Sequence, residues 1–118
     1  MSTAMQYGTS QFGSEIFNGM ELINTGYLGG ANSDEVSFEL GQHQMYILFT
    51  REITISSGAV RGFRARMYVR TENDGALQAG NLYASSNAGV TMTVSEETLT
   101  IKPSSASYDV YYSLYAVM

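Results

Sequence analysis

The sequence predicts an all-β protein, namely an antiparallel β-sandwich with an irregular N-terminal arm; a small β-barrel is the alternative. From residue 35 onward, apolar and polar side chains alternate with a period close to two, which is typical of half-buried strands. About seven such segments follow one another at spacings near ten residues, joined by short connections rich in turn-forming residues. This arrangement favours a sandwich or barrel over βαβ units.

The composition supports one folded domain built from strands. The chain has 118 residues, of which 44% are hydrophobic and only 14% charged. Soluble domains typically carry about 25% charged residues, and here glycine and tyrosine make up part of the difference. Such a chain is too apolar and too weakly charged for intrinsic disorder.

The N-terminal part is predicted to differ from the rest. Residues 1–34 are expected to form an arm and loops that can contribute to an interface, and residues 35–118 the sandwich core, within a single domain overall. Residues 15–23 fit either a short helix or a strand, because Ser14 can cap a helix that Gly19 weakens. The glycine, asparagine and serine content of residues 24–34 predicts a loop.

The central strands are expected to bury their more apolar faces. Residues 35–40 place Val36, Phe38 and Leu40 on one face. In residues 45–55 the face predicted to be buried contains Arg51, which calls for a bulge or a partner at that position. The other members of that face are Met45, Ile47, Phe49, Ile53 and Ile55.

The segment FRARMYVR, residues 63–70, gives the first candidate site. Its alternation predicts that Phe63, Ala65, Met67 and Val69 point inward. The opposite face would then carry Arg64, Arg66, Tyr68 and Arg70, an exposed row able to grip carboxylates or acidic sugars. The alternative is that these arginines pair with Glu21, Glu39 or Glu52 on neighbouring strands.

Two further strands and the end of the chain complete the predicted sandwich. Residues 90–101 alternate on both sides of a Ser-Glu-Glu turn, as in a hairpin, and Pro103 ends the second strand. In the terminal strand, YDVYYSLYAVM, one face is an ordinary core face. The other holds Tyr111 and Tyr115, which suit a subunit interface or a carbohydrate platform; a solvent-tolerant sheet surface is the alternative.

No motif for catalysis, a cofactor or a metal is found in the sequence. There is no cysteine, and His43 is the one histidine, so neither a thiolate site nor a histidine cluster can form. We therefore expect no enzyme activity, no metal and no cofactor. The N-terminus lacks the pattern of a signal peptide and no stretch is apolar enough for membrane insertion.

Charge is distributed in blocks along the chain. Residues 1–50 contain five acidic residues and no lysine or arginine, whereas residues 51–70 contain five arginines and one glutamate. Such blocks attract one another within a subunit or between subunits. The net charge of −5 argues against nucleic acid as a partner.

From about residue 59 onward the chain resembles small β-rich C-terminal modules and accessory proteins of phage and prophage tails. The resemblance is carried by the GFRARMYVR strand, the hairpin GVTMTVSEETLTIK and the closing Tyr-rich strand with Tyr115-Ala116-Val117. It implies a virion structural protein, in a tail fibre, tail tip or head decoration, that binds itself and other virion proteins. It also allows contact with a host surface glycan, so a carbohydrate-binding module is the alternative function.

Overall fold

The computed structural model describes residues 19–41, 43–70, 72, 75–85 and 89–117. This part of the chain is all-β, with eight strands and one short 3-10 helix. The elements are β1 (Met20–Gly29), η1 (Gly30–Asn32), β2 (Val36–Glu39), β3 (Met45–Thr54), β4 (Val60–Arg70), β5 (Leu77–Ala84), β6 (Val90–Ser95), β7 (Thr98–Pro103) and β8 (Tyr108–Val117).

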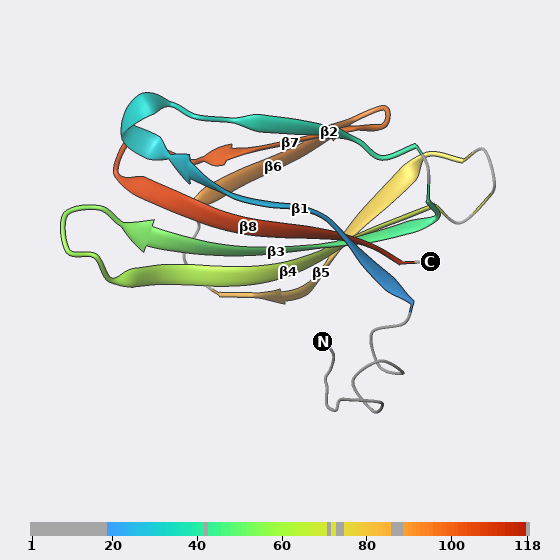
Figure 1. Ribbon diagram of the computed structural model, residues 1–118, viewed down its shortest axis with the longest axis horizontal. Coiled ribbons are helices and arrows are strands. Elements are labelled where there is room, and N and C mark those ends of the chain that lie inside the picture. Colours follow the sequence, from blue (N-terminus) through green and yellow to red (C-terminus); the bar gives the residue numbers. More distant parts are fainter. Residues whose placement is uncertain (1–18, 42, 71, 73–74, 86–88, 118) are drawn as a thin grey trace.

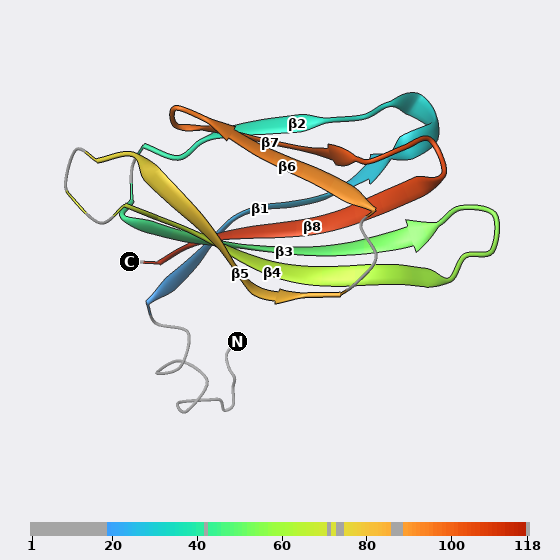
Figure 2. The ribbon, with the colours of Figure 1, turned by 180° about the vertical axis from the view of Figure 1, so that it is seen from behind.

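The strands form two antiparallel sheets that pack as the two layers of a sandwich (Figure 1). The larger sheet has the order β1-β8-β3-β4-β5, and the smaller has the order β2-β7-β6. In both views the smaller sheet lies over the β1–β8 side of the larger one (Figure 2), and β7 contacts β8 and β1. The larger sheet ends at β1 and β5 without closing on itself, so the predicted sandwich is confirmed and the barrel alternative is not adopted.

The core lies where the smaller sheet covers the larger one. The smaller sheet contributes Leu99 and Ile101 from β7 together with Val90 from β6, and the predicted inward face of β2 packs against them. From the larger sheet come alternate residues of β3 and β8: Tyr46, Leu48, Val110, Tyr112, Leu114 and Ala116. The predicted core face of the terminal strand and the predicted 90–101 hairpin are therefore confirmed.

The ambiguous N-terminal segment is a strand where the structure describes it. β1 pairs along its whole length with β8, with a bulge at Ile23 between the pairs Leu22–Tyr115 and Asn24–Leu114. The loop predicted over 24–34 is wrong as far as Gly29, because pairing with β8 extends the strand through glycines that its composition assigned to a loop. The predicted arm over residues 1–14 lies outside the described residues.

The predicted orientation of β3 and β4 is wrong. In β3 the buried residues are Tyr46, Leu48, Thr50 and Glu52, not the face that begins with Met45. β4 pairs with it in register, so Phe63, Ala65, Met67 and Val69 face away from the smaller sheet and Phe63 is 52% exposed. Arg51 thus lies on the outer face and needs no buried partner, although the β3–β4 register does shift nearby, between Glu52 and Ile53.

Candidate functional site

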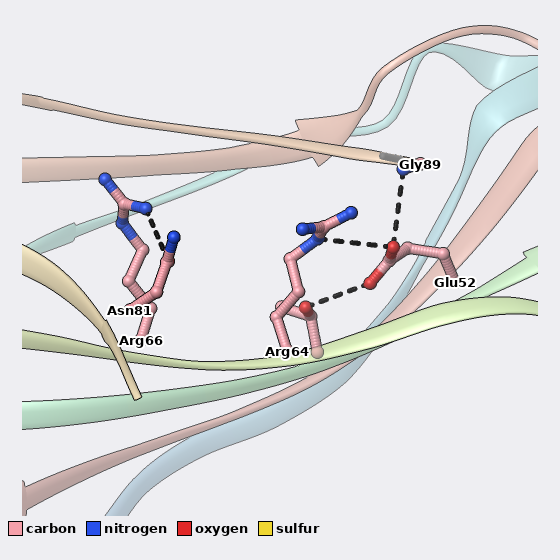
Figure 3. A network of polar contacts seen from close by, with 6 residues as sticks. Glu52, Arg64, Arg66, Asn81 and Gly89 are labelled. Carbon is pink, nitrogen blue, oxygen red and sulfur yellow. Dashed lines mark hydrogen bonds and ion pairs between the residues drawn. The ribbon is translucent and has the colours of Figure 1, made fainter. Parts of the chain in front are cut away.

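The predicted row of Arg64, Arg66, Tyr68 and Arg70 points between the two sheets, so the prediction that it is exposed is wrong. Tyr68 is 1% exposed and Arg70 9%. Figure 3 shows Arg64 and Arg66 rising from β4 toward the strands of the smaller sheet. The row is tolerated inside because the interior supplies a carboxylate, an amide and backbone carbonyls to its guanidinium groups.

Arg70 ties the sheets and a loop together. Its Nη2 donates to the Leu40 carbonyl oxygen and its Nη1 to the Gly75 carbonyl oxygen, both at 2.8 Å. Its Nη1 also lies 3.2 Å from Glu97 Oε2 in the β6–β7 turn. These contacts with backbone oxygens make Arg70 a structural residue.

Glu52 is the buried partner of Arg64. The carboxylate is fully buried, and its Oε1 lies 3.4 Å from Arg64 Nε. The same oxygen accepts a hydrogen bond from the Gly89 N–H at 3.3 Å, while Oε2 accepts one from the Thr50 hydroxyl at 3.1 Å. Of the three glutamates proposed as partners for the arginine row, Glu52 is confirmed, and the network joins β3 and β4 to the start of β6 (Figure 3).

Arg66 and Tyr68 occupy the more open part of the inter-sheet space. Arg66 Nη1 donates to Asn81 Oδ1 on β5 at 2.8 Å. Its Nε and the Tyr68 hydroxyl are buried, and neither donates to an acceptor among the described residues. Burial raises the pKa of Tyr68 above its usual value of 10, although the Arg66 charge and a hydrogen bond from Arg66 to the phenol oxygen act in the opposite direction.

The second candidate surface is the outer face of the larger sheet, which no element of the described chain covers. Pairing across all five strands places side chains of this face in one continuous array. We call this array the outer face. It comprises Met20, Leu22, Thr25, Tyr27, Met45, Ile47, Phe49, Arg51, Ile53, Phe63, Ala65, Met67, Val69, Gln78, Gly80, Tyr83, Asp109, Tyr111, Ser113, Tyr115 and Val117.

Aromatic contacts organise the outer face. Phe49 meets Tyr115 edge to face at 5.8 Å between ring centroids, and Phe63 stacks on Tyr83 at 5.3 Å. Tyr111 packs against Tyr27 at 5.1 Å. Tyr111 and Tyr115 therefore lie on the predicted face of β8, and their role as interface or ligand residues stays a prediction.

The two charged residues described on the outer face, Arg51 and Asp109, lie at one end of it and contact other residues of the subunit. The Arg51 guanidinium lies 4.9 Å from the centre of the Tyr111 ring. Asp109 accepts a hydrogen bond from the Gly30 N–H at 3.2 Å. A hydrogen bond with Asp109 raises the pKa of Tyr27.

Two shallow hollows flank Phe49 on this face. One, of about 390 Å³, lies among Met20, Ile47 and Tyr115. The other, of about 240 Å³, lies beside Thr25, Arg51 and Tyr111. Phe49, 42% exposed, lines both hollows.

The sequence analysis identifies Tyr111 and Tyr115 of the outer face but misses its β3 and β4 part, because it assigns those side chains to the core. The signal was present in β3, where Tyr46 and Leu48 made the opposite face nearly as apolar. A strand with two apolar faces indicates that both are covered.

The described residues show no metal centre and no membrane-spanning helix. No group of three or more histidine, cysteine or acidic residues within them is placed to hold a metal ion. Likewise, none of the helical structure in this part of the chain is long and apolar enough to cross a membrane.

Comparisons with known proteins give a limited result. No protein-family description and no curated protein sequence matches the chain. Among solved structures, the chain is similar to a tailspike protein, gp49 from Acinetobacter baumannii bacteriophage Fri1, a capsular polysaccharide depolymerase, with a TM-score of 0.44 and 10% sequence identity. The match covers 98% of this chain and 23% of the tailspike chain, so this chain spans about a quarter of that protein's length.

Proposed function

We propose that the protein is a non-enzymatic structural subunit of a bacteriophage virion, of a tail fibre, tail tip or head decoration, that assembles by packing its outer face on a second copy. One observation carries the assembly part of the proposal. In β4 the apolar residues from Phe63 to Val69 face outward, whereas the arginines face the smaller sheet. The virion setting rests on the resemblance of residues 59–118 to phage tail modules.

The size of the outer face fits a protein interface. Five rings on it are about half exposed, and aromatic side chains of 150–250 Å² each then leave roughly 500 Å² of ring surface open to solvent. Leu22 and the partly exposed aliphatic residues of the face add to this area. A stable interface uses about 800 Å² per partner, and apolar patches of this size on monomers mark interaction sites.

The charge of the outer face favours a second copy as the occupant. Among its described residues only Arg51 and Asp109 carry charge, and each already has a contact within the subunit. A face with few free charges does not repel its own copy, which an isologous interface requires. The partly exposed Phe49 ring beside two hollows provides a shape that can be complementary to itself.

Replacing Phe49 by lysine tests the proposal. Phe49→Lys places an unpaired charge at the centre of the outer face, and we expect it to weaken self-association at least about 30-fold, since a buried unpaired charge costs several kcal/mol. Thr93→Lys is the matched control, because Thr93 is exposed at the centre of β6, on the far side of the smaller sheet. Size-exclusion chromatography with light scattering measures the mass of both variants and of the original protein.

The expected result is an oligomer for the original protein and for Thr93→Lys, and a folded monomer for Phe49→Lys. Circular dichroism reports whether each variant keeps its strands. A monomeric original protein, or a Phe49→Lys variant that remains oligomeric, contradicts assembly through the outer face. Immunogold electron microscopy of virions tests the virion setting separately.

Carbohydrate binding is the second candidate function, favoured by the Tyr27–Tyr111–Arg51 cluster next to a hollow. Exposed tyrosine rings can stack on sugar faces, and an arginine can bind acidic groups. Tyr111→Ala separates the two functions, because it removes one exposed ring and leaves Phe49 in place. Loss of glycan-array binding with an unchanged oligomer favours the carbohydrate function, whereas absence of glycan binding by the original protein excludes it.

A further inference from the structure

A cleft of about 430 Å³ opens between β4, β5 and β6, on the side of the molecule away from the outer face. β4 contributes Arg66 and Tyr68 to its lining, and β6 contributes Met92 and Val94. Leu77 at the start of β5 and Glu96 in the β6–β7 turn complete its main walls. The cleft exists because the smaller sheet stops at β6 and no strand of it lies over β5.

Two hydrogen-bond donors in this cleft have no acceptor among the described residues, although the Tyr68 oxygen itself receives a hydrogen bond from Arg66. One is the Tyr68 hydroxyl and the other is Arg66 Nε, and both atoms are buried. Leaving a buried polar group unsatisfied costs about 1–3 kcal/mol, and native proteins contain few such groups. Phenylalanine at position 68 would fill the same space without this cost, so the hydroxyl calls for an explanation.

The chemistry of the two donors identifies what they would accept. A tyrosine hydroxyl is protonated at neutral pH and burial raises the pKa of Tyr68 further, so the hydroxyl can donate. Arg66 Nη1 is already bonded to Asn81, which leaves Nε–H directed at another acceptor. An O–H donor and a charged N–H donor on side chains two residues apart on one strand face match the two oxygens of a carboxylate.

We propose that this cleft binds a small hydroxylated carboxylate, of the kind represented by a sugar acid. The carboxylate would lie between Arg66 and Tyr68, the Met92 and Val94 wall would contact the C–H face of the ring, and Glu96 at the rim would accept hydrogen bonds from ring hydroxyls. The cavity lies toward the small end of the usual range for ligand sites, about 300–1,000 Å³, which suits one ring. Glu96 beside the rim disfavours a second negative charge on the ligand.

Entry requires one side chain to move. The two donor atoms are shielded from solvent, and the Arg66 guanidinium is tethered to Asn81 on β5 (Figure 3). The Arg66–Asn81 hydrogen bond is exposed, so its exchange for water costs little. A rotation of Arg66 therefore opens the path to Tyr68 without rearranging the sheets.

Tyr68→Phe and Tyr46→Phe form a matched pair for the test. Both tyrosines are buried in the same inter-sheet space, but the Tyr46 hydroxyl accepts a backbone hydrogen bond, from the His43 N–H at 3.0 Å, whereas the Tyr68 hydroxyl has no backbone partner and no acceptor for its proton among the described residues. Without ligand, we expect Tyr46→Phe to lower the melting temperature and Tyr68→Phe to leave it unchanged or raise it. A fall in melting temperature for Tyr68→Phe equal to that for Tyr46→Phe would show that the hydroxyl is already satisfied, and would overturn the proposal.

Binding is measured with sodium glucuronate as the probe and glucose as its neutral counterpart, by NMR titration of the original protein and of both variants. We expect glucuronate to bind the original protein and Tyr46→Phe, about tenfold or more weaker binding to Tyr68→Phe and Arg66→Met, and no binding of glucose. No response to glucuronate, or an equal response from Tyr68→Phe, overturns the proposal.

A glucuronate-terminated disaccharide distinguishes a free acid from the end unit of a longer chain. The oligomer mass of each variant is recorded in parallel, so failure of the outer-face assembly and failure of this site are distinguishable.

Discussion

Glu52 shows how single polar residues determine the orientation of this sandwich. Its carboxylate is fully buried yet has Arg64, Thr50 and the Gly89 N–H as partners. Removing one partner from such a cluster leaves the others desolvated and unpaired. The contacts of Glu52 with Arg64, Thr50 and Gly89 therefore require this face of β3 to point inward.

Glu52→Gln is expected to destabilise the protein by about 2–3 kcal/mol, because the largely buried Arg64 charge loses its ion pair with Glu52. The control is Glu39→Gln, since Glu39 is exposed and likewise accepts a threonine hydroxyl, that of Thr98, at 2.8 Å. The control should change stability by less than about 0.5 kcal/mol. Urea unfolding measures both variants.

The double variant Glu52→Gln/Arg64→Met identifies the cause. If the lost ion pair with Glu52 produces the destabilisation, replacing Arg64 with an apolar side chain restores at least half of the lost stability. A double variant less stable than Glu52→Gln alone would mean that the other contacts of Arg64 outweigh its charge pairing.

At the scale of elements, the sequence predicts the strands well and their orientation poorly. The hairpin of β6 and β7 and the core face of β8 are foreseen because one face of each strand is clearly the more apolar. β3 and β4 are inverted because the apolar face of β4 is the outer one and the arginines fill the inter-sheet space. Alternation alone cannot reveal this, since it gives two faces without saying which partner covers each.

The candidate sites divide in the same way. Tyr111 and Tyr115 follow from the simple alternation of β8 and lie on the expected face. The alternation of residues 63–70 predicts that Arg64, Arg66 and Arg70 point outward, but long arginine side chains can bury their stems and reach acceptors at the edge of a core. Predicting that these arginines point inward requires knowing that the three-stranded sheet packs on this face of the five-stranded sheet. That packing depends on contacts between residues distant in sequence.

The β6–β7 hairpin gives a prediction at this scale. Glu96 has φ of 56°, a left-handed conformation that costs a non-glycine residue about 1 kcal/mol. Glu96→Gly is therefore expected to stabilise the protein by about 0.5–1 kcal/mol. Glu97→Gly, the adjacent control, has no such strain to relieve and loses the contact with Arg70, so it should destabilise the protein. Equal losses of stability for both variants in urea unfolding would contradict this interpretation of the turn.

At the scale of the whole molecule, attraction between the acidic block of residues 1–50 and the arginines of residues 51–70 stays a prediction. Within the described part of the chain, the ion pairs of Arg64 and Arg70 use Glu52 and Glu97, both outside the acidic block. The arginines are thus largely engaged within the subunit, and the outer face is left with few charges. Self-association through that face would be driven by apolar burial.

A dimer held by apolar burial should resist salt. The Debye length falls from about 10 Å at 0.1 M to about 3 Å at 1 M salt, so contacts between charges weaken across this range while apolar burial does not. We expect the dissociation constant from sedimentation equilibrium to change by less than about threefold between 0.1 and 1 M NaCl. Arg51→Gln serves as the control, because it removes the one positive charge among the described outer-face residues and should leave this salt response unaltered. A dissociation constant that rises more than about tenfold at high salt would indicate that charged surfaces elsewhere on the molecule hold the dimer together. It would exclude the outer face as the main source of affinity.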